Sequence, residues 1–169
     1  EGGLRLQQRP ALRLVIVKGA GERAFVGGAD LEEMVRFTPA SALAFIDKIH
    51  QACHLMRALP VPSIARVQGF CLGAGMELAA ACDLRIGAEE SQYGMPEVQV
   101  GLPSVVEARL LPTLIGWGRT RELLYTGTLI GAQEARRIGF LERLAPRRDL
   151  DAAMRPWIEA ILAADPGAV

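Results

Sequence analysis

Hydrophobic residues follow two patterns along this chain: short β-branched runs, and longer stretches in which they recur every three to four positions. The runs at 12–18 and 63–67 have few polar interruptions, which is typical of strands buried on both faces of a sheet. Residues 39–57 keep an apolar stripe at helical spacing after Thr38, a favourable N-cap, and a second amphipathic helix is expected from 149. The pattern predicts an α/β chain in which strand, glycine turn and helix alternate.

Weaker signals predict further elements between these. Short strands are expected at 83–87, 91–94 and 140–144. Helices are expected at 31–36, 75–82, 105–110, 112–115, 119–125 and 131–139, the last closed by Gly139. No sequence repeat accompanies these recurring elements, so the repetition is one of structure alone.

Two glycine-rich turns join a strand to a helix, and each presents main-chain N–H groups that can bind an anion. In residues 68–82, three glycines precede the helix that contains Glu77. In residues 24–30, Gly27 and Gly28 precede another helix start. The first N–H groups of a helix have no partner within it, and they carry partial positive charge. Two such turns provide the two donors that an oxyanion hole needs.

Two glutamates lie next to this candidate anion site. Glu77 falls in the first turn of its helix, and Glu97 follows Pro96 in a stiff turn 20 positions later. Paired carboxylates beside a polarised carbonyl suit proton transfer, because one can take a proton from water while the other gives one to carbon. Burial of one of them would raise its pKa toward neutral. The residues alone leave a structural interpretation open for both, Glu77 as a favourable first-turn acid and Glu97 as a cap.

Composition limits the class of protein. The chain of 169 residues suits one domain, and a content of 50% hydrophobic and 22% charged residues is typical of a folded protein. Lys plus Arg and Asp plus Glu both number 19, and this zero net charge argues against nucleic-acid binding. No run is long enough to cross a membrane, and no signal peptide opens the chain. Because the chain starts without Met, we expect the natural N-terminus to lie further upstream.

The cysteines and histidines offer alternative chemistry. Cys53, Cys71 and Cys82 lie in apolar settings, which predicts buried thiols in a reducing compartment and favours the cytoplasm. Cys71 is near the anion site, but as a nucleophile it would need His50 or His54 as its base. These histidines are one helical turn apart; without a carboxylate or Cys at matching spacing, they predict a surface pair and no metal site.

Four segments, in this order, resemble the signatures of the crotonase superfamily, the enoyl-CoA hydratase/isomerase family. They are residues 24–31 (AFVGGADL), 68–84 (QGFCLGAGMELAAACDL), 94–97 (GMPE) and 101–103 (GLP). The similarity extends from about residue 12 to the end of the chain. It implies an α/β (α+β) spiral of repeated ββα units over 1–148, followed by the start of a C-terminal helical region at 149–169.

The resemblance also implies roles for individual residues. The N–H groups of Ala29 and Ala74 match the family's oxyanion hole, and Glu77 and Glu97 match the two acid–base glutamates of its hydratase branch. In that branch the first orients and activates water, and the second exchanges the proton at Cα. Contacts with an acyl-CoA substrate are implied for Gly27, Ala29, Asp30, Gly73 and Ser104. No metal or other cofactor is expected, because coenzyme A arrives with the substrate, and homotrimers or hexamers are implied.

Some features depart from the family pattern. Ala74 stands where a glycine is common, which leaves its N–H usable, and Glu32 stands where some members have a lysine near the CoA phosphates. Residues 104–107 (SVVE) replace a glycine-rich run, so the acyl group cannot be deduced. Both ends are shorter than the family pattern, which includes a first hairpin and a helical region that helps to cover the acyl pocket.

The sequence therefore predicts a 2-enoyl-CoA hydratase, a lyase of fatty acid β-oxidation that gives 3-hydroxyacyl-CoA. The presence of both Glu77 and Glu97 favours this over isomerase members, which commonly keep only the second. The alternatives are a dehydratase or double-bond isomerase acting on another acyl-CoA, and a scaffold member that binds CoA without catalysis. An RNA-binding member is disfavoured by the balanced charge.

Overall fold

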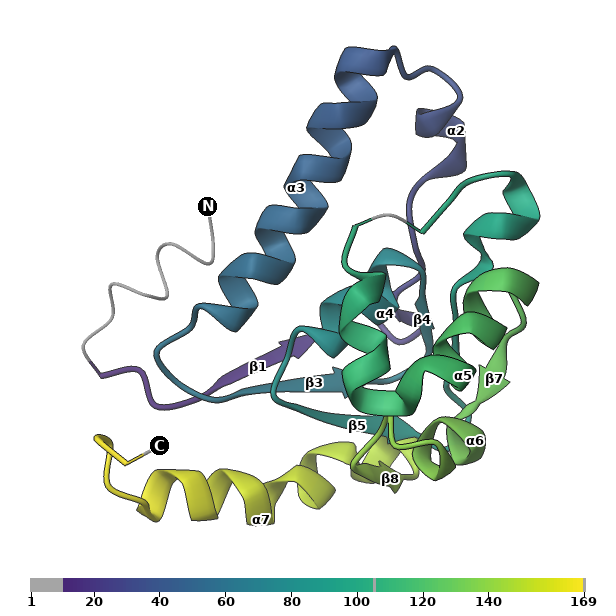
Figure 1. Cartoon of the computed structure of the whole chain (residues 1–169). Helices are drawn as coiled ribbons and strands as arrows, with labels where there is room; N and C mark the ends of the chain where they lie inside the picture. Colours follow the sequence, from purple (N-terminus) through teal and green to yellow (C-terminus); the bar gives the residue numbers. More distant parts are fainter. Residues whose placement is uncertain (1–10, 105, 169) are drawn as a thin grey trace.

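The computed structural model describes residues 11–104 and 106–168. Residues 1–10, where the expected core begins, and Val105, where one expected helix begins, lie outside the described part of the chain. Within that part the strands form two four-stranded sheets, which lie between helix α3 at the top of Figure 1 and helix α7 at the bottom. The chain passes repeatedly from one sheet to the other.

The first sheet is entirely parallel among the described strands. Its order is β1 (Val15–Lys18), β3 (Ser63–Val67), β5 (Leu84–Ala88) and β8 (Arg143–Ala145). The register places Val15 opposite Ser63 and Ile64 opposite Leu84. Ile64, Ala65 and Val67 are fully buried, as the largely apolar run predicts for an inner strand covered on both faces.

The second sheet is built from short strands that follow those of the first. Its order is β2 (Ala24–Val26), β4 (Phe70–Leu72), β6 (Gln92–Gly94) and β7 (Ile130–Gly131). The first three are parallel, and β7 runs antiparallel to β6. Each of the strands β1, β3 and β5 thus leads into a neighbour in the other sheet and then into helical structure, which confirms the predicted repetition of ββα units.

The longer helices begin and end close to the positions that the local sequence predicts. Helix α3 (Pro39–Arg57) starts at Thr38, whose hydroxyl oxygen accepts the Ser41 N–H at 3.2 Å, while the Ser41 hydroxyl oxygen accepts the Thr38 N–H at 2.8 Å. The remaining helices are α2 (Leu31–Met34), α4 (Ala74–Ala80), α5 (Leu111–Thr126), α6 (Ala132–Arg137) and α7 (Leu150–Ala163), with 3-10 turns η1 (Pro96–Val100), η2 (Ala108–Leu110) and η3 (Arg147–Asp149). Gly116, with φ 75°, interrupts α5, which matches the two separate helices expected there.

Two clusters of buried side chains hold the layers together. The larger joins the sheets to α4, α5 and α6, and its members include Phe25, Met76, Tyr93, Leu111 and Phe140. The smaller packs α7 on the first sheet through Ile64, Ile86, Leu150 and Met154. Helix α7 therefore covers the face of the first sheet that would otherwise expose its apolar strands.

Several predictions of local structure were wrong. Residues 24–26 form strand β2 where a glycine turn was expected, and strand β7 at 130–131 was not expected. The buried strand expected at 12–18 begins only at Val15, and its Ile16 is 41% exposed at the edge of the sheet. Residues 70–72 form strand β4, where the sequence predicted only a turn between strand and helix; the surrounding glycines hid a three-residue element that β2 and β6 stabilise from either side. Of the helix expected at 105–110, only the 3-10 turn Ala108–Leu110 is observed, and residues 102–104 have no regular structure. The main chain at Glu107, with φ −125° and ψ 16°, is not that of a regular helix, and its buried side chain binds His50 and Arg109.

Candidate active site

A cavity of about 400 Å³ lies between α3, the N-terminus of α4 and η1. One side is apolar and includes Phe37, Phe45, Ile46 and Ile49 from α3 and the residues before it. The other side contains the groups that the sequence singled out, namely Gly27, Ala29, Gly73, Ala74, Glu77, Glu97 and Ser104. The structure thus brings both glycine turns and both glutamates to one space.

Glu77 occupies the first turn of α4, and its side chain is only 2% exposed. Its carboxylate Oε1 accepts the main-chain N–H of Glu107 at 3.1 Å. Burial raises the pKa of Glu77 from 4.5 to about 7, and the nearby charges of Glu97 and Glu107 act in the same direction; hydrogen bonds from the Glu107 and Ala108 amides oppose them. A carboxyl group with a pKa near neutral can take up or release a proton under ordinary conditions.

Glu97 reaches the same cavity from η1, where Pro96 fixes the first position of the turn. The Ser104 hydroxyl donates a hydrogen bond to Glu97 Oε2 at 3.0 Å. Gly73 is the neighbour on the other side: it has φ 53°, and a Cβ added there would lie 2.3 Å from Glu97 Oε1. Gly73 is therefore required both for its own main-chain conformation and for the space that the carboxylate occupies.

The two predicted oxyanion donors lie at the edges of the glycine turns. Ala29 precedes α2, and Ala74 is the first residue of α4, where a helical N–H has no partner within the helix. No main-chain hydrogen bond within the described part of the chain uses either amide. Both residues line the cavity, as the predicted oxyanion hole requires.

Tight packing holds these turns in place. A Cβ on Gly75 would lie 2.2 Å from the Val26 carbonyl oxygen, so only glycine lets α4 approach β2 this closely. The buried Gln68 side chain donates from Nε2 to the carbonyl oxygens of Gly19, Gly21 and Ala24, at 3.1, 3.2 and 2.7 Å. These bonds tie the end of β3 to the connection between β1 and β2, and so fix the strand that leads to Ala29.

The C-terminal end of α4 is held by the buried side chain of Arg85. Its guanidinium donates to the carbonyl oxygens of Cys82 at 2.7 Å and Phe140 at 2.7 Å, and it pairs with Glu142. A cation at this end of a helix interacts favourably with the helix dipole and with the unpaired carbonyls. Arg85 thus fixes the helix whose first turn carries Glu77.

Sequence reasoning missed a third acidic group, Glu107. Its side chain is 1% exposed, with one oxygen 2.6 Å from His50 Nδ1 and the other accepting from Arg109 Nε at 3.1 Å. Burial acts to raise the pKa of Glu107, but the hydrogen bonds from Arg109 and His50 outweigh it and the pKa is lowered. His50 and Glu107 are 57 positions apart, and no local pattern could have paired them.

Some predicted groups lie elsewhere. The Asp30 carboxylate accepts the N–H groups of Glu32 and Glu33 at 2.9 and 3.3 Å, so it caps α2, and it is not among the residues that line the cavity. His50 and His54 stack with their ring centres 6.3 Å apart, but His50 also binds Glu107, which the expectation of a plain surface pair did not include. Among residues 11–104 and 106–168, no three His, Cys, Asp or Glu side chains are grouped to hold a metal ion.

The alternative of a cysteine nucleophile finds no support in the geometry. Cys53, Cys71 and Cys82 are all buried and free, as predicted. Cys71 is fully buried in β4 and does not line the cavity, and burial raises the pKa of its thiol. A thiol in this setting stays protonated and is a poor nucleophile.

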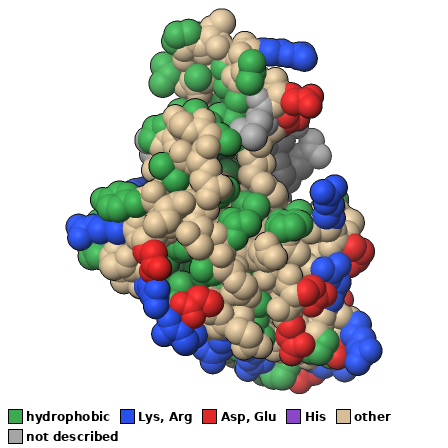
Figure 2. Space-filling model, turned by 90° about the vertical axis from the view of Figure 1, so that its right-hand side faces the viewer, with side chains coloured by type: hydrophobic (Ala, Val, Ile, Leu, Met, Phe, Trp, Pro, Cys, Tyr) green, Lys and Arg blue, Asp and Glu red, His purple; other side chains and the backbone are tan. Residues whose placement is uncertain are grey.

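The outer surface agrees with the balanced composition. On the face shown in Figure 2, acidic and basic side chains are interspersed and gather mainly over the lower part, with hydrophobic side chains above and between them. No helix in the described part of the chain is both long and apolar enough to cross a membrane.

Comparisons with known structures identify the fold. The fold matches crystal structures of enoyl-CoA hydratases: one from Bacillus anthracis superposes with a TM-score of 0.92 at 36% identity, covering 97% of this chain and 64% of that one. The fold and the cavity thus define a protein of the crotonase fold.

Sequence comparison gives the family. The family model for enoyl-CoA hydratase/isomerase matches residues 4–169. YngF of Bacillus subtilis, named as an enoyl-CoA hydratase/isomerase, is 40% identical over 159 residues, which are 94% of this chain and 61% of that protein. Crotonyl-CoA hydratase of Syntrophomonas wolfei is 39% identical over 142 residues, 83% of this chain and 55% of that protein. The chain belongs to the enoyl-CoA hydratase/isomerase family, and it spans a little more than half the length of these two relatives.

Proposed function

We propose that this protein is a 2-enoyl-CoA hydratase, which adds water across the 2,3 double bond of an enoyl-CoA thioester to give a 3-hydroxyacyl-CoA. The observation that carries the proposal is the single cavity shared by two glutamates and two main-chain N–H donors. A relative of this chain is named as a crotonyl-CoA hydratase, which agrees with the same reaction type.

The N–H groups of Ala29 and Ala74 would receive the thioester oxygen. Negative charge develops on that oxygen when water attacks C3, because the electrons of the double bond move toward the carbonyl. Two preorganised donors stabilise this charge without reorganising during the reaction. Coenzyme A enters as part of the substrate, and the proposal needs no further cofactor.

Glu77 and Glu97 divide the proton transfers between them. Ionised Glu77 accepts a proton from the attacking water, so that oxygen bonds to C3, while Glu97 delivers a proton to C2 and the double bond is consumed. A pKa of about 7 suits Glu77 for this role, since it is ionised above neutral pH yet basic enough to accept a proton. Ser104 holds Glu97 in position through its hydroxyl group.

The cavity favours an uncharged acyl chain. Among the described residues that line it, only Glu77 and Glu97 are charged, and the α3 side consists of apolar side chains. A substrate with a second carboxylate would bring an unpaired negative charge into this space, which is costly in an apolar environment. We therefore expect crotonyl-CoA and longer aliphatic enoyl-CoAs to be preferred over glutaconyl-CoA.

The test is the loss of enoyl absorbance on mixing the protein with crotonyl-CoA, a longer enoyl-CoA and glutaconyl-CoA. Glu77→Gln and Glu97→Gln should each lower kcat by about 10²–10⁴-fold, while binding of a saturated acyl-CoA is retained. Ser104→Ala should lower kcat less. Binding without turnover in the parent protein would contradict the hydratase and favour the scaffold alternative; a shifted double bond without added water would identify an isomerase.

The expected homotrimer or hexamer stays a prediction. Light scattering on the purified protein would measure its mass directly, and a monomer at all concentrations would contradict it.

A further inference from the structure

The segment that connects η1 to η2 contacts both proposed acid–base groups. From this segment the Ser104 hydroxyl donates to Glu97, and the Glu107 N–H donates to Glu77. Residues 102–104 have no regular secondary structure, so no helical or strand hydrogen bonds define their path. Something else must hold the Glu107 amide against Glu77.

The Glu107 side chain supplies that attachment. It is 1% exposed, and both of its oxygens are bound, one to His50 and one to Arg109. Its own carbonyl oxygen accepts the Leu110 N–H at 2.9 Å and so begins the turn that leads into α5. A carboxylate held by a guanidinium and an imidazole is a strong anchor for its main chain, because hydrogen bonds to a charged group are short and directional.

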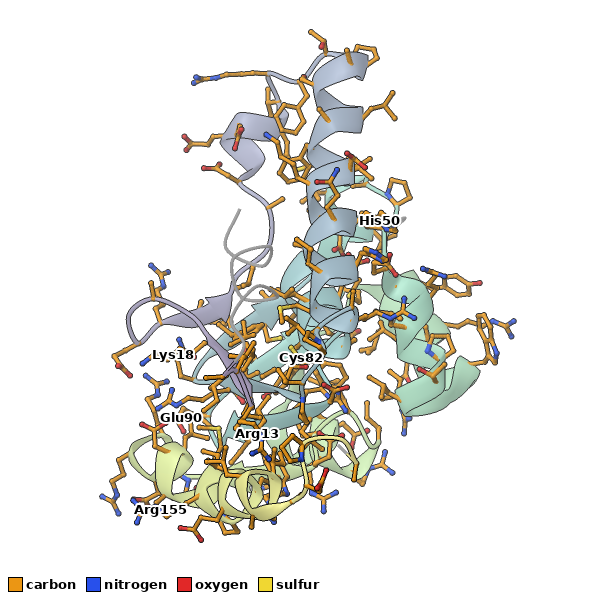
Figure 3. All side chains as sticks on the ribbon, turned by 90° about the vertical axis from the view of Figure 1, so that its left-hand side faces the viewer. Arg13, Lys18, His50, Cys82, Glu90 and Arg155 are labelled. Carbon is orange, nitrogen blue, oxygen red and sulfur yellow. The ribbon has the colours of Figure 1, made fainter. Side chains whose placement is uncertain are left out.

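His50 extends the attachment to the apolar side of the cavity. It lies on α3 between Ile49, which lines the cavity, and the buried Cys53. Figure 3 shows its ring on one flank of α3, and its Nδ1 is 2.6 Å from Glu107 Oε1. The helix that would contact the acyl chain is thereby linked, through one hydrogen bond, to the residue that holds Glu77.

We propose that Glu107 is a positioning residue for Glu77, anchored by His50 and Arg109 so that its main-chain N–H fixes the Glu77 carboxylate. Glu107 itself does not touch the substrate in this scheme, because its side chain is buried and both oxygens are occupied. The proposal deepens the function proposed above, but its first test below does not depend on turnover.

The groups that face this cluster set the direction of the expected effect. Glu77 faces Glu97 from η1, Glu107 from the connecting segment and Cys53 from α3. The Glu107 amide lowers the pKa of Glu77 by more than the Glu107 charge raises it. Removing the anchor and releasing the amide should therefore raise the pKa of Glu77, whereas removing the charge alone should leave it unchanged or lower it slightly.

The experiment follows the carboxyl carbon of Glu77 by NMR in protein labelled with ¹³C at glutamate Cδ, with Glu77→Gln identifying the signal. Glu107→Ala should move the titration of Glu77 upward by about one pH unit, the size expected when a carboxylate loses a hydrogen bond. Glu107→Gln, which keeps the shape and hydrogen-bonding oxygen, should not move it upward. His50→Ala should shift it in the same direction as Glu107→Ala by a smaller amount, and the matched variant His54→Ala should leave it in place.

An unchanged or lowered Glu77 titration in folded Glu107→Ala would overturn the proposal, as would equal shifts in His50→Ala and His54→Ala. If Glu107→Ala does not fold, the contrast between His50→Ala and His54→Ala decides. A kinetic arm adds that the acidic limb of kcat moves with the Glu77 titration while KM for crotonyl-CoA changes less than about threefold. A parent protein without turnover would refute the hydratase but leave the NMR result valid.

Discussion

Glu77→Gln should stabilise the protein at alkaline pH while greatly slowing the proposed reaction. In the folded state burial raises the pKa of Glu77 to about 7, whereas an unfolded chain leaves it near 4.5. Between these values the folded protein binds more protons than the unfolded one, so its free energy of unfolding falls as pH rises and then stays low above 7. The neutral amide of Gln has no such dependence.

The magnitude follows from the distance between the two pKa values. The interval from 4.5 to about 7 corresponds to a penalty of about 3 kcal/mol above neutral pH, most of which appears between pH 5 and pH 8. The side chain is 2% exposed, so solvent screens little of it. Gln preserves the shape and can still accept the Glu107 N–H through its amide oxygen.

Urea unfolding at pH 5 and pH 8, followed by tryptophan fluorescence, would measure the effect. We expect the free energy of unfolding of Glu77→Gln, relative to that of the parent, to be about 2.5 kcal/mol higher at pH 8 than at pH 5. The matched variant Glu159→Gln changes an exposed residue of α7 and should shift stability by less than about 0.5 kcal/mol at either pH. Equal stability differences at pH 5 and pH 8 for Glu77→Gln would refute the reasoning.

Two further predictions test the supports of the site. Gly73→Ala places a Cβ against Glu97 in a main chain with φ 53°. We therefore expect a loss of roughly 1–3 kcal/mol in unfolding free energy and a large fall in kcat. The control Gly118→Ala, where a Cβ meets nothing and φ is not positive, should be neutral or stabilising. Arg85→Met leaves Glu142 and the carbonyl oxygens of Cys82 and Phe140 without their partner, and should cost about 3–5 kcal/mol by urea unfolding. Arg155→Met, on the exposed side of α7 in Figure 3, should change little, and similar losses in both variants would contradict the role given to Arg85.

Much of the fold could be predicted because its strongest elements have local causes. The apolar run at 63–67 and the Thr38 cap of α3 are signals that can be recognised within a few residues of sequence. Strand β4 could not be predicted, because Phe70–Leu72 is too short to show a period and becomes a strand only between β2 and β6. Local sequence thus determines the long elements, and partners determine the short ones.

The sequence predicted the residue types of the site but not all of the contacts between them. Glycine turns and fixed glutamates have local signatures, and the structure places Ala29, Ala74, Glu77 and Glu97 on one cavity. Their proposed roles remain predictions. Glu107 gave no signal, because a glutamate in a sequence is usually exposed, and only the folded chain shows it buried between His50 and Arg109. Long-range ion pairs of this kind cannot be deduced from spacing.

The alternation of strands between two sheets has a consequence for how the chain acquires its structure. Strand β1 ends at Lys18 but its neighbour β3 begins only at Ser63, and β8, which completes the first sheet, ends at Ala145. Pairings so distant in sequence close large loops and slow the search for the native state. During synthesis, the described strands of the second sheet cannot all pair before Gly131 has been made, nor those of the first before Ala145. We therefore expect nascent intermediates with exposed strand edges, for which chaperones are the natural protection.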